Sequence, residues 1–175
     1  MRGKVNLRHP VALRPCVVRE LCRRAKDGDR AKPRHETFGF MFGTIGKRRT
    51  VVRKAIYYGG GRKTLTGIDF RGQRQFTCLK NRRRAIARKL HLRFLSCFHS
   101  HMKIRGYVQK TLSQDDINFF LFDKEAPLEF IVCVWSDNNL CKRSKTAVTV
   151  RKAYNYRIQG YRKTKNAVRR IAVKR

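Results

Sequence analysis

Acidic residues are scarce in this chain of 175 residues: 11 Asp and Glu stand against 44 Lys and Arg, a formal net charge of +33. Such a chain repels itself, so we expect a polyanionic partner that neutralises it, and nucleic acid is the commonest one. The acids are also unevenly placed. Six of the eleven lie between Asp115 and Asp137, none follows Asp137, and Asp69 is the single acid between Thr37 and Gln114. One segment is therefore near neutral and the remainder almost purely basic.

Long apolar runs are also missing, since no stretch approaches 18 apolar residues. The sequence has no lipidation motif, and its first residues, MRGKVNLRHP, lack the apolar core of a secretory signal. We therefore expect a cytoplasmic protein with no membrane partner. The six cysteines form no C-x-x-C pair, and most lie in apolar stretches such as FIVCVW. We interpret them as reduced, packed residues, with a cysteine zinc site as the alternative.

Hydrophobic residues make up 41% of the chain, which is enough for one folded domain. Periodicity predicts helices over 14–28, 76–91 and 113–123 and strands over 5–13, 36–46, 49–58, 93–101, 128–138 and 146–156. The Phe- and Gly-rich stretch 36–46 is typical of a buried strand with close backbone neighbours. The order of elements predicts an α/β (α+β) fold with a mixed sheet flanked by helices, formed by residues 1–150. Residues 151–175 are predicted to be a basic C-terminal extension.

Two histidines, His99 and His101, alternate along the predicted strand 93–101. Alternate residues of a strand point to the same face about 7 Å apart, so both side chains can reach one cation. An Asp from the following helix would be a third ligand, and three protein ligands with an open position are typical of catalytic zinc. The alternative is that H-x-H arises by chance and that Ser113 and Asp116 form only a helix-starting capping box.

Glu36 opens the strand ETFGFMFG, and a helix, a strand with His-x-His and then Ser-x-x-Asp follow. This combination resembles the JAMM (MPN) family of zinc metalloproteases over roughly residues 5 to 150. The resemblance implies a JAMM/MPN-like (cytidine-deaminase-like) fold and Zn²⁺ held by His99, His101 and Asp116. It implies that Glu36 is the general acid/base and that Ser113 donates a hydrogen bond to the developing oxyanion.

The chain departs from the family pattern in two places. Met102 follows the second histidine where the family usually has proline. The eleven residues 102–112, MKIRGYVQKTL, form a longer spacing before Ser113 than is typical of the family. This insertion either bulges outward and leaves the site intact or moves Ser113 and Asp116 out of reach, in which case Asp115 is a substitute ligand.

Lys and Arg on nearly every predicted loop and helix, unpaired by acids, predict contacts with the phosphates of a structured RNA. In the last residues Tyr154, Tyr156 and Tyr161 are interleaved with arginines, which is typical of proteins that bind single-stranded or irregular RNA. We therefore expect this segment to be irregular, or to fold on RNA. The candidate RNA-binding residues are Lys47, Arg48, Arg49, Arg82, Arg83, Arg84, Arg88, Lys89, Lys152, Arg157, Arg162, Lys163, Arg169 and Arg170.

Two functional hypotheses follow from these patterns. The first is a ribosome- or rRNA-associated basic protein, similar in composition to ribosomal proteins, on a JAMM-like fold that retains its zinc site. The alternative is an active zinc-dependent isopeptidase or peptidase, similar to deubiquitinases, that cleaves a peptide or ubiquitin-like substrate with Glu36 as general base. The acid-rich segment 115–137 places the site on the less basic side, so the sequence leaves both hypotheses open.

Overall fold

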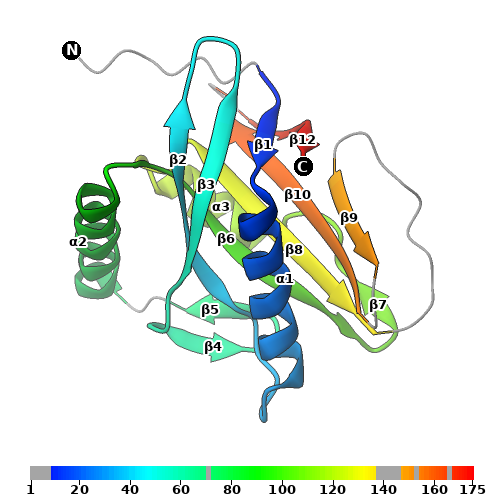
Figure 1. The fold of residues 1–175 in the computed structure, drawn as a ribbon. Coiled ribbons are helices and arrows are strands. Elements are labelled where there is room, and N and C mark those ends of the chain that lie inside the picture. The colour runs from blue at the N-terminus through cyan, green and yellow to red at the C-terminus, as the bar shows by residue number, and fades with distance from the viewer. Residues whose placement is uncertain (1–8, 70–71, 137–146, 152–153, 165–166) are drawn as a thin grey trace.

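The computed structural model describes residues 9–69, 72–136, 147–151, 154–164 and 167–175. Within these ranges the chain forms a mixed α+β fold, with a strongly curved sheet and three helices (Figure 1). The helices are α1 (Pro15–Arg30), α2 (Gly72–Leu90) and α3 (Gln114–Phe122). The strands are β1 (Val11–Leu13), β2 (Phe38–Ile45), β3 (Thr50–Tyr57), β4 (Arg62–Thr64), β5 (Gly67–Asp69), β6 (Arg93–Ile104), β7 (Tyr107–Val108), β8 (Leu128–Trp135), β9 (Ala147–Arg151), β10 (Asn155–Lys163), β11 (Val168–Ile171) and β12 (Val173–Lys174).

The main sheet is nearly closed on itself. In the part of the chain that the structure describes, its strand order is β11-β10-β8-β6-β2-β3-β1-β12, with β7 and β9 paired beside β6 and β10. Strand β11 pairs with β10 at one end of this order and β12 pairs with β1 at the other. Only Ala172 separates β11 from β12. The two ends of the sheet must therefore lie close together, which requires the sheet to curl.

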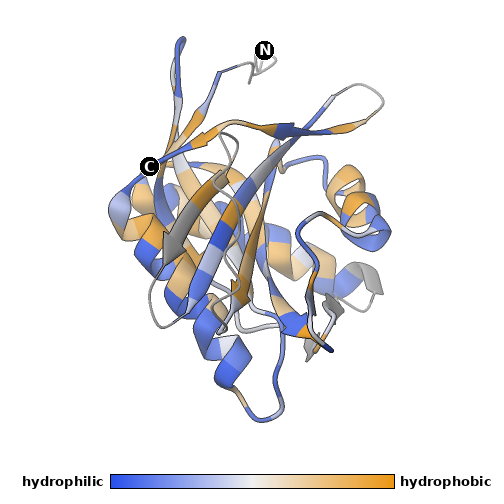
Figure 2. Ribbon diagram, turned by 90° about the vertical axis from the view of Figure 1, so that its right-hand side faces the viewer, coloured by the Kyte–Doolittle hydropathy of each residue, from blue (hydrophilic) through white to orange (hydrophobic). Residues whose placement is uncertain are grey.

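Helix α1 covers one face of the sheet. Proline at its first position suits a helix start, because proline lacks an N–H and the first N–H of a helix has no partner within the helix. Its apolar residues repeat at helical spacing, and Val17, Leu21 and Ala25 are buried in one cluster with Met41 and Phe98 of the sheet. Figure 2 shows the alternation of apolar and polar residues along the helices. This stripe is what fixes α1 against the strands.

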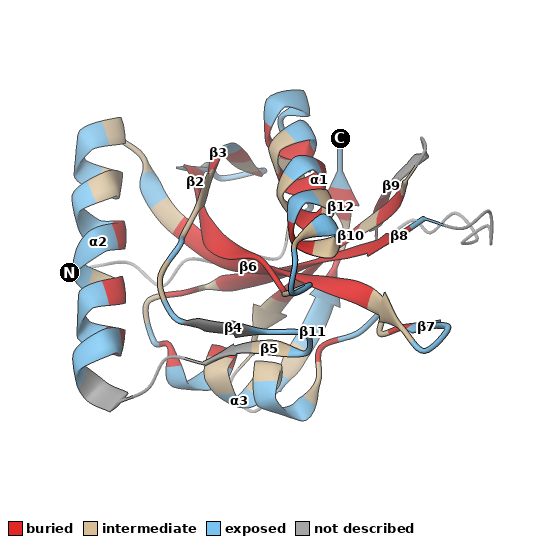
Figure 3. Ribbon diagram, turned by 90° about the horizontal axis from the view of Figure 1, so that it is seen from below, coloured by how far each residue is buried: buried red, intermediate tan, exposed pale blue. Residues whose placement is uncertain are grey.

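Helices α2 and α3 cover the opposite face of the sheet. Helix α2 packs Phe76 and Leu79 against the phenylalanines of β2, among them Phe40. Helix α3 packs Phe120 against Ile131 of β8. In Figure 3 the central strands are buried along most of their length between the helices. The mixed sheet flanked by helices is therefore confirmed, and the sheet face toward α2 and α3 is a second apolar core.

Two glycines in β2 allow its neighbours to approach closely. A Cβ at Gly39 would lie 2.2 Å from the backbone oxygen of Ile56, and one at Gly43 would lie 2.0 Å from that of Val51. Both distances are far below contact distance, so a side chain at either position would force the strands apart. The prediction that residues 36–46 form a buried strand with close backbone neighbours is confirmed.

The expectation of an irregular C-terminal segment is wrong. Strand β10 pairs with β8 from Asn155 to Arg162 and lies inside the sheet. Tyr156 and Tyr161 are buried in the cores rather than exposed for stacking on bases, and Tyr154 is half-buried. Because apolar residues alternate along this segment, burying them in the sheet outweighs the solvation of the arginines between them. Residues 154–164 and 167–175 thus complete the sheet.

Candidate metal centre

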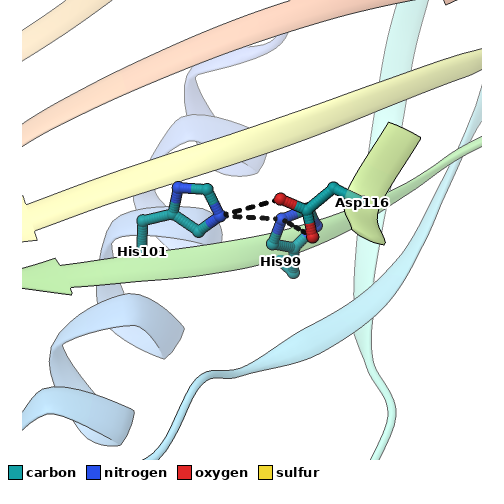
Figure 4. Close-up of side chains that lie close together, drawn as sticks. All are labelled: His99, His101 and Asp116. Carbon is teal, nitrogen blue, oxygen red and sulfur yellow. Dashed lines mark hydrogen bonds and ion pairs between the residues drawn. The ribbon is translucent and has the colours of Figure 1, made fainter. Parts of the chain in front are cut away.

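His99 and His101 project from the same face of β6, the strand at the centre of the sheet. Strand β6 pairs with β2 on one side and with β8 on the other, so both imidazoles are buried. Their Nε2 atoms lie 3.0 Å apart (Figure 4). Two nitrogen lone pairs at this distance repel each other unless a proton or a cation lies between them. The predicted strand and the shared face are confirmed.

Asp116 reaches the histidines from the first turn of α3. Its carboxylate oxygens lie 3.2 Å from Nε2 of His99 and 3.4 Å from Nε2 of His101. The backbone N–H of Ser113 donates to Asp116 at 2.7 Å, and the Ser113 hydroxyl accepts from the Asp116 backbone N–H at 3.1 Å. This is a complete capping box. The capping box is therefore confirmed, and it is compatible with the ligand interpretation, because the cap fixes the carboxylate that faces the imidazoles.

These three side chains have the geometry of a metal site. Their ligand atoms all lie within 4.8 Å of one another. The edge of a tetrahedron with bonds of about 2.0–2.1 Å is roughly 3.3 Å. The two Nε2 atoms lie 3.0 Å apart, and the two oxygens of Asp116 lie 3.2 Å from one of them and 3.4 Å from the other. Two neutral imidazoles and one carboxylate suit Zn²⁺, and other divalent metals accept the same donors. Among the described residues no cysteine joins this group.

The outer nitrogen of each histidine is also fixed. Nδ1 of His99 lies 3.2 Å from the carboxylate of Glu129, which is buried in β8. Nδ1 of His101 lies 2.8 Å from the backbone oxygen of Gln109. Each Nδ1–H thus donates to an oxygen, which leaves the Nε2 lone pairs directed at Asp116 and at each other. Such outer partners hold the tautomer and the ring orientation of metal-binding histidines.

Neither Glu129 nor Gln109 was found from the sequence. A signal existed for Glu129, because it is the single charged residue in the otherwise apolar strand LEFIVCVW, and a buried carboxylate needs a partner. Gln109 contributes a backbone atom, so no residue-type signal could have identified it. It comes from the insertion 102–112.

That insertion bulges outward and leaves the site intact. Strand β6 continues to Ile104, the chain turns at Arg105 and Gly106 with φ of 47° and 83°, and β7 returns alongside β6. The returning arm brings the Gln109 carbonyl to His101. The structure therefore places Asp116 with the histidines, while Asp115 is exposed outside the group.

Glu36 lies immediately before β2, buried beside the histidines. Its backbone N–H donates to the oxygen of Thr64 at 2.9 Å, which fixes the segment leading into β2. Burial, with a contribution from Asp116, raises the pKa of Glu36 to about 8, against the opposing effect of His99. A cavity of about 260 Å³ is lined by Glu36, Ser113, Asp116 and His101. Of the predicted catalytic and metal-binding residues, all but His99 thus line one cavity.

The electrostatics of the cluster are dominated by the pairing of imidazole and carboxylates. Burial lowers the pKa of His99, but Asp116 and Glu129 outweigh it, so the pKa lies well above its ordinary value. Burial raises the pKa of Asp116, but His99 and His101 outweigh that effect and lower it. Burial also raises the pKa of Glu129, which its hydrogen bond to His99 partly offsets. A positive charge beside Asp116 is therefore strongly favoured.

Arg83 is not available to RNA, contrary to the prediction. Its side chain is 0% exposed and forms ion pairs with Asp123 and, at 2.9 Å, with Glu125. Its guanidinium lies 4.4 Å from the ring centroid of Phe94. Arg83 lies on the inward face of α2 in register with Leu79, and pairing it with a buried acid offsets the cost of taking the charge out of water.

The other predicted RNA-binding residues differ in their exposure and in their partners. Arg84 pairs with Glu125, and Lys163 donates to the backbone oxygen of Asp123, so both have acidic or backbone partners. Arg157 and Arg162 are partly buried. Besides Arg84, the exposed ones are Lys47, Arg48, Arg49, Arg82, Arg88, Lys89, Arg169 and Arg170. Lys152 lies outside the described residues.

Comparisons with known proteins find a similar fold for this chain but assign it to no family. No protein-family model and no curated protein matches the chain. Protein DSY2949 from Desulfitobacterium hafniense, known from a solution structure, has a similar fold, with a TM-score of 0.58 and 15% sequence identity. The match covers 93% of this chain and 90% of that one. At this identity the likeness defines the class as a mixed α+β domain and carries no function.

None of the helices in the described part of the chain is long and apolar enough to span a membrane.

Proposed function

We propose that this protein is a metal-dependent hydrolase of amide bonds that uses Zn²⁺. The observation that carries the proposal is the convergence of His99, His101 and Asp116, from a strand and a helix, with Glu36 on the same cavity. The Nδ1 partners of both histidines support it, because they orient both Nε2 atoms toward Asp116, where a cation would bind. The order of these residues along the chain resembles the JAMM (MPN) zinc metalloproteases, and a JAMM-like fold is part of the proposal.

A bound zinc ion would supply a Lewis acid that polarises the scissile carbonyl and acidifies water. Glu36 accepts one proton from the attacking water while the water oxygen forms a bond to the carbonyl carbon. The same carboxyl group then delivers that proton to the nitrogen as the C–N bond breaks, which leaves a carboxylic acid and an amine. The Ser113 hydroxyl accepts one hydrogen bond within the capping box, so its own hydrogen is available for the carbonyl oxygen. Burial of Glu36 supports this role, since an apolar setting favours proton exchange near neutral pH.

The decisive experiment separates metal binding from cleavage. Purified protein is analysed for bound metal and assayed on an internally quenched peptide library and on an isopeptide-linked ubiquitin dimer. We expect one zinc per chain and cleavage of at least one of these amide substrates. Glu36→Gln should retain zinc and lose at least about 10²-fold in activity, since it removes the proton acceptor. Absence of zinc in the wild-type protein, or full activity in Glu36→Gln, contradicts the proposal.

A second function, binding of structured RNA, is favoured by the exposed basic side chains on a chain with a net charge of +33. We propose RNA such as that of the ribosome as the partner, in the cytoplasm. The affinity should fall steeply between 50 and 200 mM salt, by a factor on the order of 10³ for six or more phosphate contacts. Sedimentation with ribosomal fractions before and after a high-salt wash tests the association in cells. An affinity that does not change with salt contradicts it.

A further inference from the structure

The metal centre and the β2–β3 turn lie at opposite ends of the same strands. Strands β2 and β6 are antiparallel, with Phe38 opposite His99 near the metal centre and Gly43 opposite Arg93 at the far end. Beyond Gly43 the β2–β3 hairpin closes at Gly46, whose N–H donates to the oxygen of Arg49 at 2.9 Å. In Figure 1 this hairpin extends from the top of the sheet, and the small strands β4 and β5 lie at the bottom.

The hairpin end of the sheet is densely basic. The hairpin turn, the last turn of α2 and the first residue of β6 all expose cationic side chains there. Among the described residues 44–50 and 86–93 there is no acid. We call this surface the basic end, and its residues are Lys47, Arg48, Arg49, Arg88, Lys89 and Arg93.

The basic end lies far from the cavity. His99 lies six positions after Arg93 along β6, which is roughly 20 Å at the rise of a strand. Lys47 lies eleven positions after Glu36, or roughly 35 Å away where the intervening chain is extended. A ligand that contacts the basic end therefore does not reach the mouth of the cavity unless it wraps around the molecule.

The structure also indicates how the basic end would contact its ligand. Tyr156 and Tyr161 are buried, so the aromatic platform expected for stacking on single-stranded bases does not exist in the described residues of β10. Lysines and arginines on a turn contact phosphates, which suits a duplex recognised by its shape. The large exposed hydrophobic side chains of the described residues are Leu65, Tyr107, Leu121 and Phe122. None of them belongs to the basic end, which disfavours a membrane surface.

We propose that double-helical RNA docks on the basic end through its phosphates and leaves the metal cavity open, so that one molecule holds RNA and an amide substrate together. This inference rests on the RNA binding proposed above. It goes beyond that proposal in naming the surface that binds the RNA and the contacts to phosphates that hold it. It also states that RNA and the amide substrate occupy their sites independently.

The test variant removes the three charges of the hairpin turn: Lys47→Gln, Arg48→Gln and Arg49→Gln combined. Its affinity for a labelled RNA stem-loop is measured by fluorescence anisotropy between 50 and 200 mM salt. We expect the slope of log affinity against log salt to decrease by about 2–3, and the affinity at 150 mM salt to fall at least about tenfold.

The matched control removes the same number of charges from α1 and the residues after it: Arg19→Gln, Arg30→Gln and Lys32→Gln combined. All three side chains are exposed and lie outside the basic end. This variant should keep its salt slope within about one unit of the wild type. An equal loss in both triple variants overturns the assignment of the basic end, while RNA binding itself stands. Failure of the wild-type protein to bind RNA refutes the RNA proposal as a whole.

Independent occupancy needs a second readout. Zn²⁺ affinity, measured by competition with a chromophoric chelator, should agree within twofold with and without saturating RNA. A tenfold or larger change overturns the separation of the two sites. Tighter binding to a DNA duplex of the same sequence, or to phosphatidylserine vesicles, overturns RNA as the occupant.

Discussion

Glu129→Gln is the substitution that most directly tests whether His99 belongs to a metal centre. Glu129 is 3% exposed, and its carboxylate lies 3.2 Å from Nδ1 of His99. Glutamine has nearly the same shape, so the change leaves the packing of β8 intact and removes only the charge. A neutral acceptor forms a hydrogen bond about half as strong as a carboxylate does. The imidazole of His99 then loses both basicity and a fixed orientation.

The magnitude follows from the role of such outer partners. Loss of one typically weakens metal binding 10–100-fold, and each factor of ten corresponds to about 1.4 kcal/mol. We therefore expect Glu129→Gln to bind Zn²⁺ about 1.4–2.8 kcal/mol more weakly than the wild type. The assay is competition with a chromophoric chelator, and the visible spectrum of bound Co²⁺ reports whether the ligand set is preserved.

The control for this variant is Asp115→Asn. It removes one negative charge next to Asp116, but Asp115 is exposed and lies outside the ligand group. Screening by solvent should limit its effect on Zn²⁺ affinity to about twofold. Equal losses in the two variants would mean that overall charge rather than the hydrogen bond to His99 sets the affinity. Unchanged affinity in Glu129→Gln would refute the reasoning outright.

Three further predictions concern stability, measured by denaturant unfolding. Arg83→Ala should lower the free energy of unfolding by about 3–5 kcal/mol because it leaves a buried carboxylate unpaired, while Arg82→Ala on the exposed face should cost at most about 0.5 kcal/mol. Gly39→Ala should lower the free energy of unfolding by about 3 kcal/mol, because its Cβ would collide with the backbone of the neighbouring strand. Gly59→Ala should be near neutral, because a Cβ there would meet its nearest atom at 3.8 Å. Equal effects of the two substitutions would contradict the close packing described at Gly39. Burial lowers the pKa of Lys163 to about 8, so between pH 8 and 10.5 the unfolded chain holds the proton more often and stability rises with pH. Relative to Lys163→Met, the wild type should therefore gain up to about 1 kcal/mol over this range, after discounting for solvent screening, and a flat difference would show that the side chain is not desolvated.

Periodicity and short motifs predicted much of the site. Alternation along β6 put His99 and His101 on one face, and the Ser-x-x-Asp spacing placed Asp116 in the first turn of the next helix. These relations are local, because they depend on residues a few positions apart. The meeting of Glu129 with His99 depends on strands β6 and β8 lying side by side and in register, which a residue pattern within one strand does not specify.

Some basic residues that were predicted to contact RNA are buried instead, and their spacing along the sequence indicated this. Arg83 was grouped with its neighbours as part of a charged surface, yet Leu79, Arg83, Ile86 and Leu90 follow one helical stripe. That spacing predicts an inward side chain and hence a buried acid to pair with it. Composition dominated the interpretation of the last residues as well, where the alternation of Tyr156 and Ile158 indicated a strand. In both cases periodicity was the better guide than charge.

Ala172 has a consequence for how the chain folds as it is made. It links the two strands that join opposite ends of the sheet, so the outer edge of β1 gains its partner β12 only after Val173 and Lys174 have been synthesised. About 160 residues lie between Val11 and Val173, and at 5–20 residues per second their synthesis takes roughly 10–30 s. Once β3 has paired with β1, the other edge of β1 stays open to pairing with other chains for the rest of that interval. The growing chain thus carries an unpaired sheet edge from the time β3 has joined β1 until β12 is made, and chaperone contact is expected to concentrate at that edge.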